Sequence, residues 1–116
     1  MAGLDYLEVE FDQVRRLRYR VRDLRDLCLA LDNITLLQLL QRLAGIDLNA
    51  LYTTVRFGLL HEAPKLTQRQ VEGYIDAHLD KFGNLSRITD AIAQLINATG
   101  LISPERGDAS GEAKAS

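Results

Sequence analysis

The hydrophobic pattern changes its period at Asp23, and this change constrains the fold more than any other feature. Before it, apolar side chains occupy every second position of two runs: Leu7, Val9 and Phe11, then Leu17, Tyr19 and Val21. A period of two is typical of β-strands. After it, apolar side chains take helical spacing: Leu24, Leu27, Cys28 and Leu31. The sequence therefore predicts an α+β fold, mostly α, with an N-terminal β-hairpin over 5–22 and helices over about 23–100.

Charges on the polar side of the two runs indicate how the strands pair. With Phe11 opposite Arg15 at the turn, we expect two apolar pairs across the hairpin: Val9 with Leu17, and Leu7 with Tyr19. On the other face the same register places Glu10 against Arg16 and Glu8 against Arg18. Opposite charges paired across strands stabilise a hairpin modestly, so this register suits both faces.

Capping residues and glycines divide the rest of the domain into five short helices. The first begins at Asp23, and the second runs from about Leu36 to Ala44, capped by Asn33 or Thr35 and stopped by Gly45. The third, from about Leu48 to Glu62, follows Asp47. The fourth begins at a capping box, Thr67 with Gln70, and ends at Gly83. The fifth begins at Asn84 or Ser86 and ends at Gly100. Leu48 and Leu79 are expected to face inward with the apolar stripes of their helices.

Length and composition bound the domain and its surroundings. With 116 residues the chain makes about one domain, which we place at 1–102, followed by a disordered polar tail over 103–116. A net charge of −2 argues against broad attraction to nucleic acid or to acidic membranes. The longest uncharged stretch, 91–104, is too short and too polar to span a bilayer. We therefore expect a cytoplasmic protein that binds neither membrane nor nucleic acid.

Few side chains here are suited to catalysis or metal binding. One Cys and two His cannot close a Cys/His zinc site. His61-Glu62 lacks the second His of an H-E-x-x-H motif, and His78, between Asp76 and Asp80, is expected on the surface. Cys28 lies on an inward stripe, as a buried hydrophobe would. We predict no catalytic, metal or cofactor site, and no enzyme.

Two groups of residues are candidates for binding a partner. Six arginines lie between positions 15 and 25. Three interpretations are open for Arg16, Arg18 and Arg20: pairing with Glu8 and Glu10 on a solvated strand face, binding of nucleic acid phosphates, or contact with an acidic protein partner. The second group surrounds most of the second helix: Leu36, Leu37, Leu39, Leu40 and Leu43. This helix either lies between others or exposes a leucine patch that meets another protein.

A pair of consecutive segments supports a family resemblance. A helix ending in Gly58-Leu59-Leu60-His61-Glu62-Ala63-Pro64 precedes Leu66-Thr67-Gln68-Arg69-Gln70-Val71 and Tyr74-Ile75-Asp76. With the hairpin and the leucine-spaced helix, this layout resembles the tail assembly chaperones of long-tailed bacteriophages and gene transfer agents, over roughly residues 6–100. The resemblance implies a small, mostly helical domain that begins with a β-hairpin.

The resemblance also implies a function without catalysis. Such chaperones bind the tape-measure protein or the tail tube protein in the host cytoplasm, keep it soluble, and are absent from the finished particle. The expectation is therefore an assembly factor that binds these proteins and associates with its own copies. A structural head–tail connector or head completion protein is the alternative, and a helical DNA-binding regulator is the third.

Overall fold

The computed structural model describes residues 6–100, and the predicted tail over 103–116 lies outside them. Within this range the chain forms an antiparallel hairpin of β1 (Leu7–Glu10) and β2 (Val14–Leu17). Five helices follow: α1 (Val21–Ala30), α2 (Leu36–Ala44), α3 (Leu48–Leu59), α4 (Gln68–Phe82) and α5 (Ser86–Ala98). The predicted class, α+β and mostly α with an N-terminal hairpin, is confirmed.

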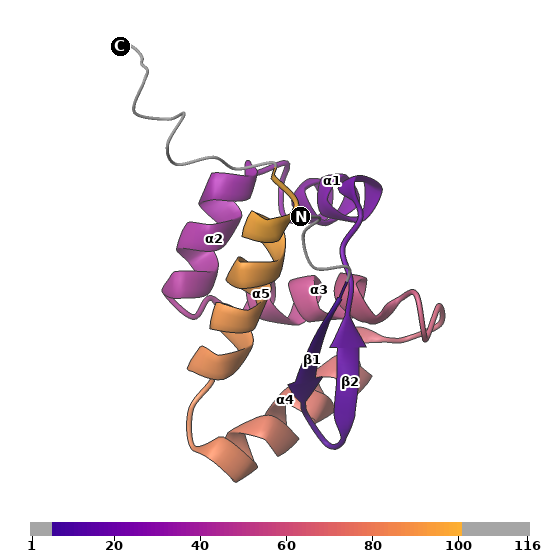
Figure 1. The fold of residues 1–116 in the computed structure, drawn as a ribbon, viewed down its shortest axis with the longest axis vertical. Helices are drawn as coiled ribbons and strands as arrows, with labels where there is room; N and C mark the ends of the chain where they lie inside the picture. Colours follow the sequence, from indigo (N-terminus) through magenta and orange to yellow (C-terminus); the bar gives the residue numbers. More distant parts are fainter. Residues whose placement is uncertain (1–5, 101–116) are drawn as a thin grey trace.

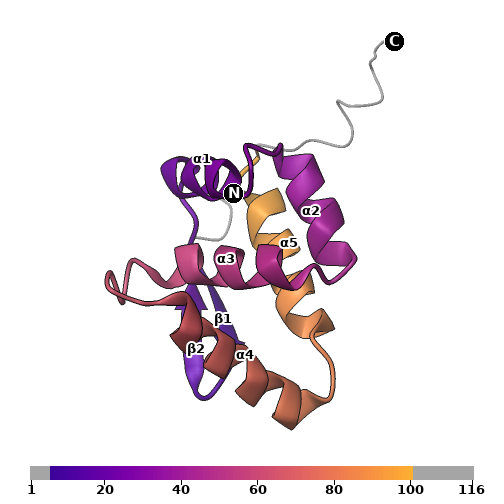
Figure 2. The ribbon, with the colours of Figure 1, turned by 180° about the vertical axis from the view of Figure 1, so that it is seen from behind.

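Helix α3 occupies the centre of the fold. It contacts α1, α2, α4 and β2, while α5 packs against β1 and α2. In Figure 1 the hairpin lies in front of α3, and in Figure 2, which is the view from behind, α3 lies in front of the hairpin. Helices α2 and α5 lie side by side in both views. A single cluster of buried side chains joins these elements, including Phe11, Leu27, Leu51, Ile75 and Ile92. The core therefore draws on every element of residues 6–100.

The helix ends follow the capping chemistry of the sequence. Thr35, Asp47 and Thr67 are the N-caps of α2, α3 and α4, and each accepts a hydrogen bond from the backbone three residues later. Gly83 ends α4 in the left-handed region, at φ 77°. Asp23 acts from inside the first turn of α1, where its carboxylate accepts the backbone N–H of Arg20 at 2.9 Å. Helix α1 therefore begins two residues before the predicted start, at Val21.

The predicted hairpin register is wrong by two residues. Leu7 lies opposite Leu17, Glu8 opposite Arg16, and Glu10 opposite Val14. A shift of two residues keeps each side chain on its predicted face of the sheet, because side chains alternate with a period of two. The three-residue loop is closed by Asp12, whose carboxylate accepts the backbone N–H of Gln13 at 2.9 Å. Phe11 leaves the strand at this loop and is fully buried.

Strand β2 ends at Leu17, five residues before the predicted end of the hairpin. The Arg18 N–H donates to the Gly58 carbonyl of α3 at 3.0 Å, and the Tyr19 hydroxyl donates to the Thr54 carbonyl at 2.6 Å. These bonds turn the chain from β2 onto α3. The third helix also ends early, at Leu59, whose carbonyl accepts the N–H groups of both Glu62 and Ala63.

Three side chains on helices lie on the side opposite to their prediction. Leu48 and Leu79, expected inside, are 47% and 40% exposed, while His78, expected outside, is 1% exposed. Leu48 is the first residue of α3, where the helix has not yet entered the core. On α4 the buried face runs through Val71, Ile75 and His78, because the helix is rotated toward the hairpin. The histidine therefore fills the core position predicted for leucine.

Candidate partner-binding surfaces

The five leucines of α2 do not form one exposed patch. Leu39 and Leu43 are 0% and 1% exposed, so the prediction of a leucine surface is wrong for these two. The physical reason is that α2 contacts α1, α3 and α5 and buries the face that carries them. Leu36 and Leu40 are half-buried against the core, and Leu37 is exposed. Leu37 is therefore the leucine of this set that a partner can reach most easily.

An exposed apolar surface lies on α1. Val21 and Leu29, eight residues apart on one side of the helix, are 64% and 55% exposed. A shallow groove of about 310 Å³ lies beside them, lined by residues of α1, of the loop after it and of the start of α2: Val21, Leu24, Arg25, Cys28, Leu29, Asn33, Ile34 and Leu36. Burial raises the pKa of the Cys28 thiol, which favours the uncharged, unreactive form. The groove is therefore an apolar surface without a nucleophile poised for attack.

The predicted arginine set is divided between two places. Arg16 lies on the hairpin, 3.7 Å from the Glu8 carboxylate and over the Tyr6 ring at 4.8 Å. Arg18 and Arg20 lie beyond the strand, where they line a pocket of about 250 Å³ with Arg22, Asp23, Leu60 and His61. The prediction of one arginine face is therefore wrong, because the chain leaves the strand after Leu17 and enters α1. Arg22, which is not among the predicted residues, lines this pocket together with Arg18 and Arg20.

Both histidines bind backbone carbonyls of the hairpin. His61 Nε2 donates to the Arg16 carbonyl on β2 at 2.9 Å, and His78 Nδ1 donates to the Glu10 carbonyl on β1. His78 also lines a cavity of about 390 Å³ between β1, α4 and α5, and its Nε2 has no hydrogen-bond partner among residues 6–100. This role differs from the surface position that the sequence predicts for His78. The spacing of Val71, Ile75, His78 and Phe82 on one helix face was the available signal.

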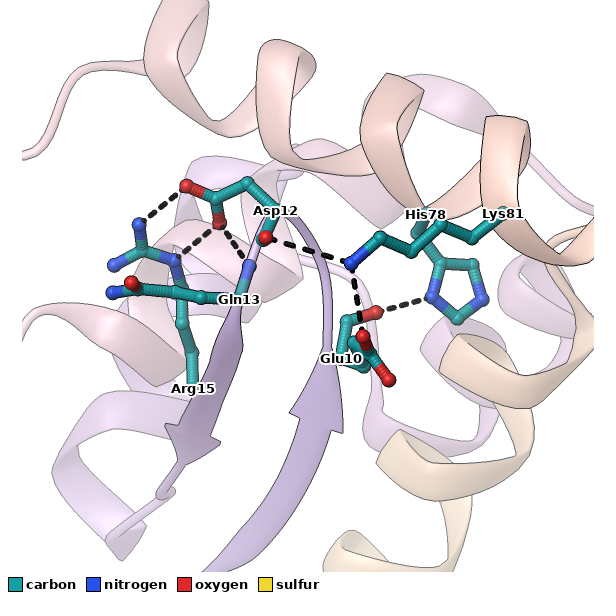
Figure 3. A network of polar contacts seen from close by, with 6 residues as sticks. All are labelled: Glu10, Asp12, Gln13, Arg15, His78 and Lys81. Atoms are coloured by element: carbon teal, nitrogen blue, oxygen red, sulfur yellow. Dashed lines mark hydrogen bonds and ion pairs between the residues drawn. The ribbon is translucent and has the colours of Figure 1, made fainter.

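A polar network holds the hairpin turn to α4 (Figure 3). Lys81 Nζ lies 2.9 Å from the Glu10 carboxylate and 3.5 Å from the Asp12 carbonyl, and Arg15 donates two hydrogen bonds of 2.9 Å to the Asp12 carboxylate. The hydrogen bond from Lys81 lowers the pKa of Glu10, and that from Arg15 lowers the pKa of Asp12. Arg15 also stacks on Tyr74, with its guanidinium carbon 3.9 Å from the ring centroid. These groups are occupied by contacts within the fold.

Within residues 6–100, no group of three or more His, Cys, Asp or Glu side chains is arranged to hold a metal ion. In the same range no helix has the length and apolar character needed to cross a membrane.

Comparison with known proteins provides no relative. No protein family, no curated protein and no solved structure matches the chain.

Proposed function

We propose that this protein is a phage tail assembly chaperone that binds the tape-measure protein or the tail tube protein and keeps it soluble before assembly. The observation that carries the proposal is the exposed apolar surface of α1, with Val21 and Leu29 beside the groove of about 310 Å³. Exposed apolar side chains that line a groove are typical of sites that bind an apolar segment of another protein. The hairpin and the helices that follow it also agree with the architecture that the resemblance implies.

Large apolar side chains that the fold leaves in water favour the binding of a partner that covers them. Covering a valine or leucine side chain contributes roughly 1.5–3 kcal/mol relative to leaving it exposed. Val21 and Leu29, which line the groove, are each more than half exposed. A partner that covers this surface gains from the hydrophobic effect without any chemical step. A tail protein that aggregates when unassembled has complementary apolar surface to offer.

Co-expression with the tape-measure protein and the tail tube protein of the same genome tests the proposal. We expect the wild-type chain to keep at least one of them soluble, and Leu29→Asp to lose this effect because a carboxylate would occupy the apolar surface. Leu48→Asp is the matched control, since Leu48 is 47% exposed and lies on α3 outside the groove. Circular dichroism establishes that both variants fold.

Two results would contradict the proposal. In the first, Leu29→Asp protects the tail proteins as well as the wild type does. In the second, the protein is a stoichiometric component of purified particles, which would favour the structural connector instead.

Association between copies is the second part of the proposal, since a long partner offers repeated sites. His61 donates to the Arg16 carbonyl of β2, and His78 donates to the Glu10 carbonyl of β1. Strand pairing between copies would therefore be restricted to the backbone positions of the hairpin that these bonds leave open. Light scattering at increasing concentration should show a rising mean mass, and a constant monomer mass would contradict this part.

A further inference from the structure

The pocket at the start of α1 is walled by three arginines. Arg18, Arg20 and Arg22 surround its volume of about 250 Å³ together with Asp23, Leu60 and His61. Arg18 comes from the segment after β2, Arg20 is the N-cap of α1, and Arg22 lies in its first turn. The three arginines lie close together because Tyr19 and Arg18 bind α3 and turn the chain there. Their arrangement is therefore a consequence of the fold.

One nitrogen of this pocket is unsatisfied. The Arg18 Nε is buried and has no hydrogen-bond partner among residues 6–100. Other arginines of the fold direct the same atom at an acceptor: Arg15 Nε donates to Asp12, and Arg56 Nε donates to the Leu66 carbonyl at 2.8 Å. A buried donor without an acceptor destabilises the fold, and more so when the group is charged. Arg18 is therefore held in an unfavourable arrangement, and an incoming acceptor would relieve it once the side chain shifts enough to expose the Nε.

The charges of the pocket are also left without counterions. Within the described range, no ion pair joins Arg18, Arg20 or Arg22 to a carboxylate, whereas Arg15, Arg16 and Arg25 each have one. Asp23 is the acidic residue in the pocket wall, and its carboxylate already accepts the Arg20 N–H. Basic side chains at a helix N-terminus are further disfavoured by the positive end of the helix dipole. The local field therefore favours a bound anion.

We propose that this pocket binds an oxyanion, namely the carboxylate of an aspartate or glutamate in a protein partner. The planar guanidinium fork matches a carboxylate with two parallel hydrogen bonds, which a single ammonium group cannot offer. A nucleic acid strand is less suited, because phosphates recur along it and the neighbouring arginines Arg15, Arg16 and Arg25 are already paired. The assignment concerns the pocket alone and does not depend on a phage tail protein as the partner.

The test follows the Arg18 Nε–H resonance by nitrogen–proton NMR during titration of the full chain. Three probes are added separately: a short capped polyglutamate peptide, inorganic phosphate, and a single-stranded DNA oligonucleotide. We expect the peptide to shift the Arg18 signal saturably, with phosphate producing the same shift at higher concentration. Arg18→Lys keeps the charge but removes the fork, and should weaken peptide binding roughly tenfold or more.

Matched variants make the result decisive. Arg22→Gln removes a pocket arginine from an exposed helical position and should also weaken peptide binding, which covers the case in which Arg18→Lys fails to fold. Arg69→Gln, an exposed arginine on α4 outside the pocket, should leave binding unchanged. The proposal is overturned by any of three results: no saturable shift at Arg18, equal weakening by Arg69→Gln, or tighter, steeply salt-dependent binding of the DNA.

Discussion

Tyr19 lies across Gly58 so closely that a Cβ added to the glycine would be 2.6 Å from the tyrosine hydroxyl oxygen. The same hydroxyl donates a hydrogen bond of 2.6 Å to the Thr54 carbonyl, one turn earlier on α3. This contact fixes the segment that carries Arg18 and Arg20 against the central helix. The absence of a side chain at position 58 therefore determines where the arginine pocket forms.

The first prediction concerns glycine at two helical positions. Gly58→Ala should destabilise the fold by about 1–3 kcal/mol, because the new methyl group would meet the Tyr19 ring and a Leu17 methyl carbon. Gly73→Ala, on α4 with no atom within 4 Å of the added carbon, should instead stabilise it by roughly 0.5–1 kcal/mol. Urea denaturation followed by circular dichroism measures both. Similar changes in the two variants would contradict the close approach of Tyr19.

The second prediction is the tautomer of His78. Because a carbonyl can only accept, the contact with Glu10 requires the proton on Nδ1, which leaves Nε2 of the neutral ring as an acceptor. Nitrogen-15 NMR of the imidazole should show a protonated Nδ1 and an unprotonated Nε2. His61 is the internal control, since its contact with Arg16 requires the proton on Nε2. A neutral His78 with its proton on Nε2 would contradict the contact with β1.

The third prediction is a pH dependence of stability. The pKa of Glu10 is lowered by its hydrogen bond from Lys81, so the folded state favours the carboxylate. The resulting stability is present above the ordinary pKa of 4.5 and is lost as pH falls through the lower value of the folded state. Lys81→Gln should therefore lower the free energy of unfolding at neutral pH and flatten its decline in acid.

Lys65→Gln is the control for this experiment, since Lys65 is exposed and takes part in none of the ion pairs within residues 6–100. Acid titration of the free energy of unfolding should give the same curve for Lys65→Gln and the wild type. If Lys81→Gln also gave that curve, the ion pair with Glu10 would make no contribution to stability.

The elements that the sequence predicts well are those set by local chemistry. Thr35, Asp47, Thr67 and Gly83 stand at the helix ends where capping predicts them, because a cap needs its near neighbours alone. The end of β2 depends instead on the bond between Tyr19 and Thr54, which joins residues 35 positions apart. No local pattern contains that contact.

The candidate surfaces are harder to predict for the same reason. Leu37 and Leu39 are both leucines of α2, and packing against other helices decides that one is exposed and the other buried. Arg16 and Arg18 alternate with apolar residues in the same way, but the turn at Tyr19 places them at different sites. The polarity of His78 predicts a surface position, although its helical spacing also suits the core, where it lies.

Hydrogen exchange on the complex with the tape-measure or tail tube protein tests the central claim most directly. Partner binding should slow exchange at the backbone amides of α1, Val21–Ala30, and at the start of α2, because these segments line the apolar groove. Exchange in α4 on the opposite side of α3 should change little. Protection confined to α4, or no complex with either tail protein, would contradict the account.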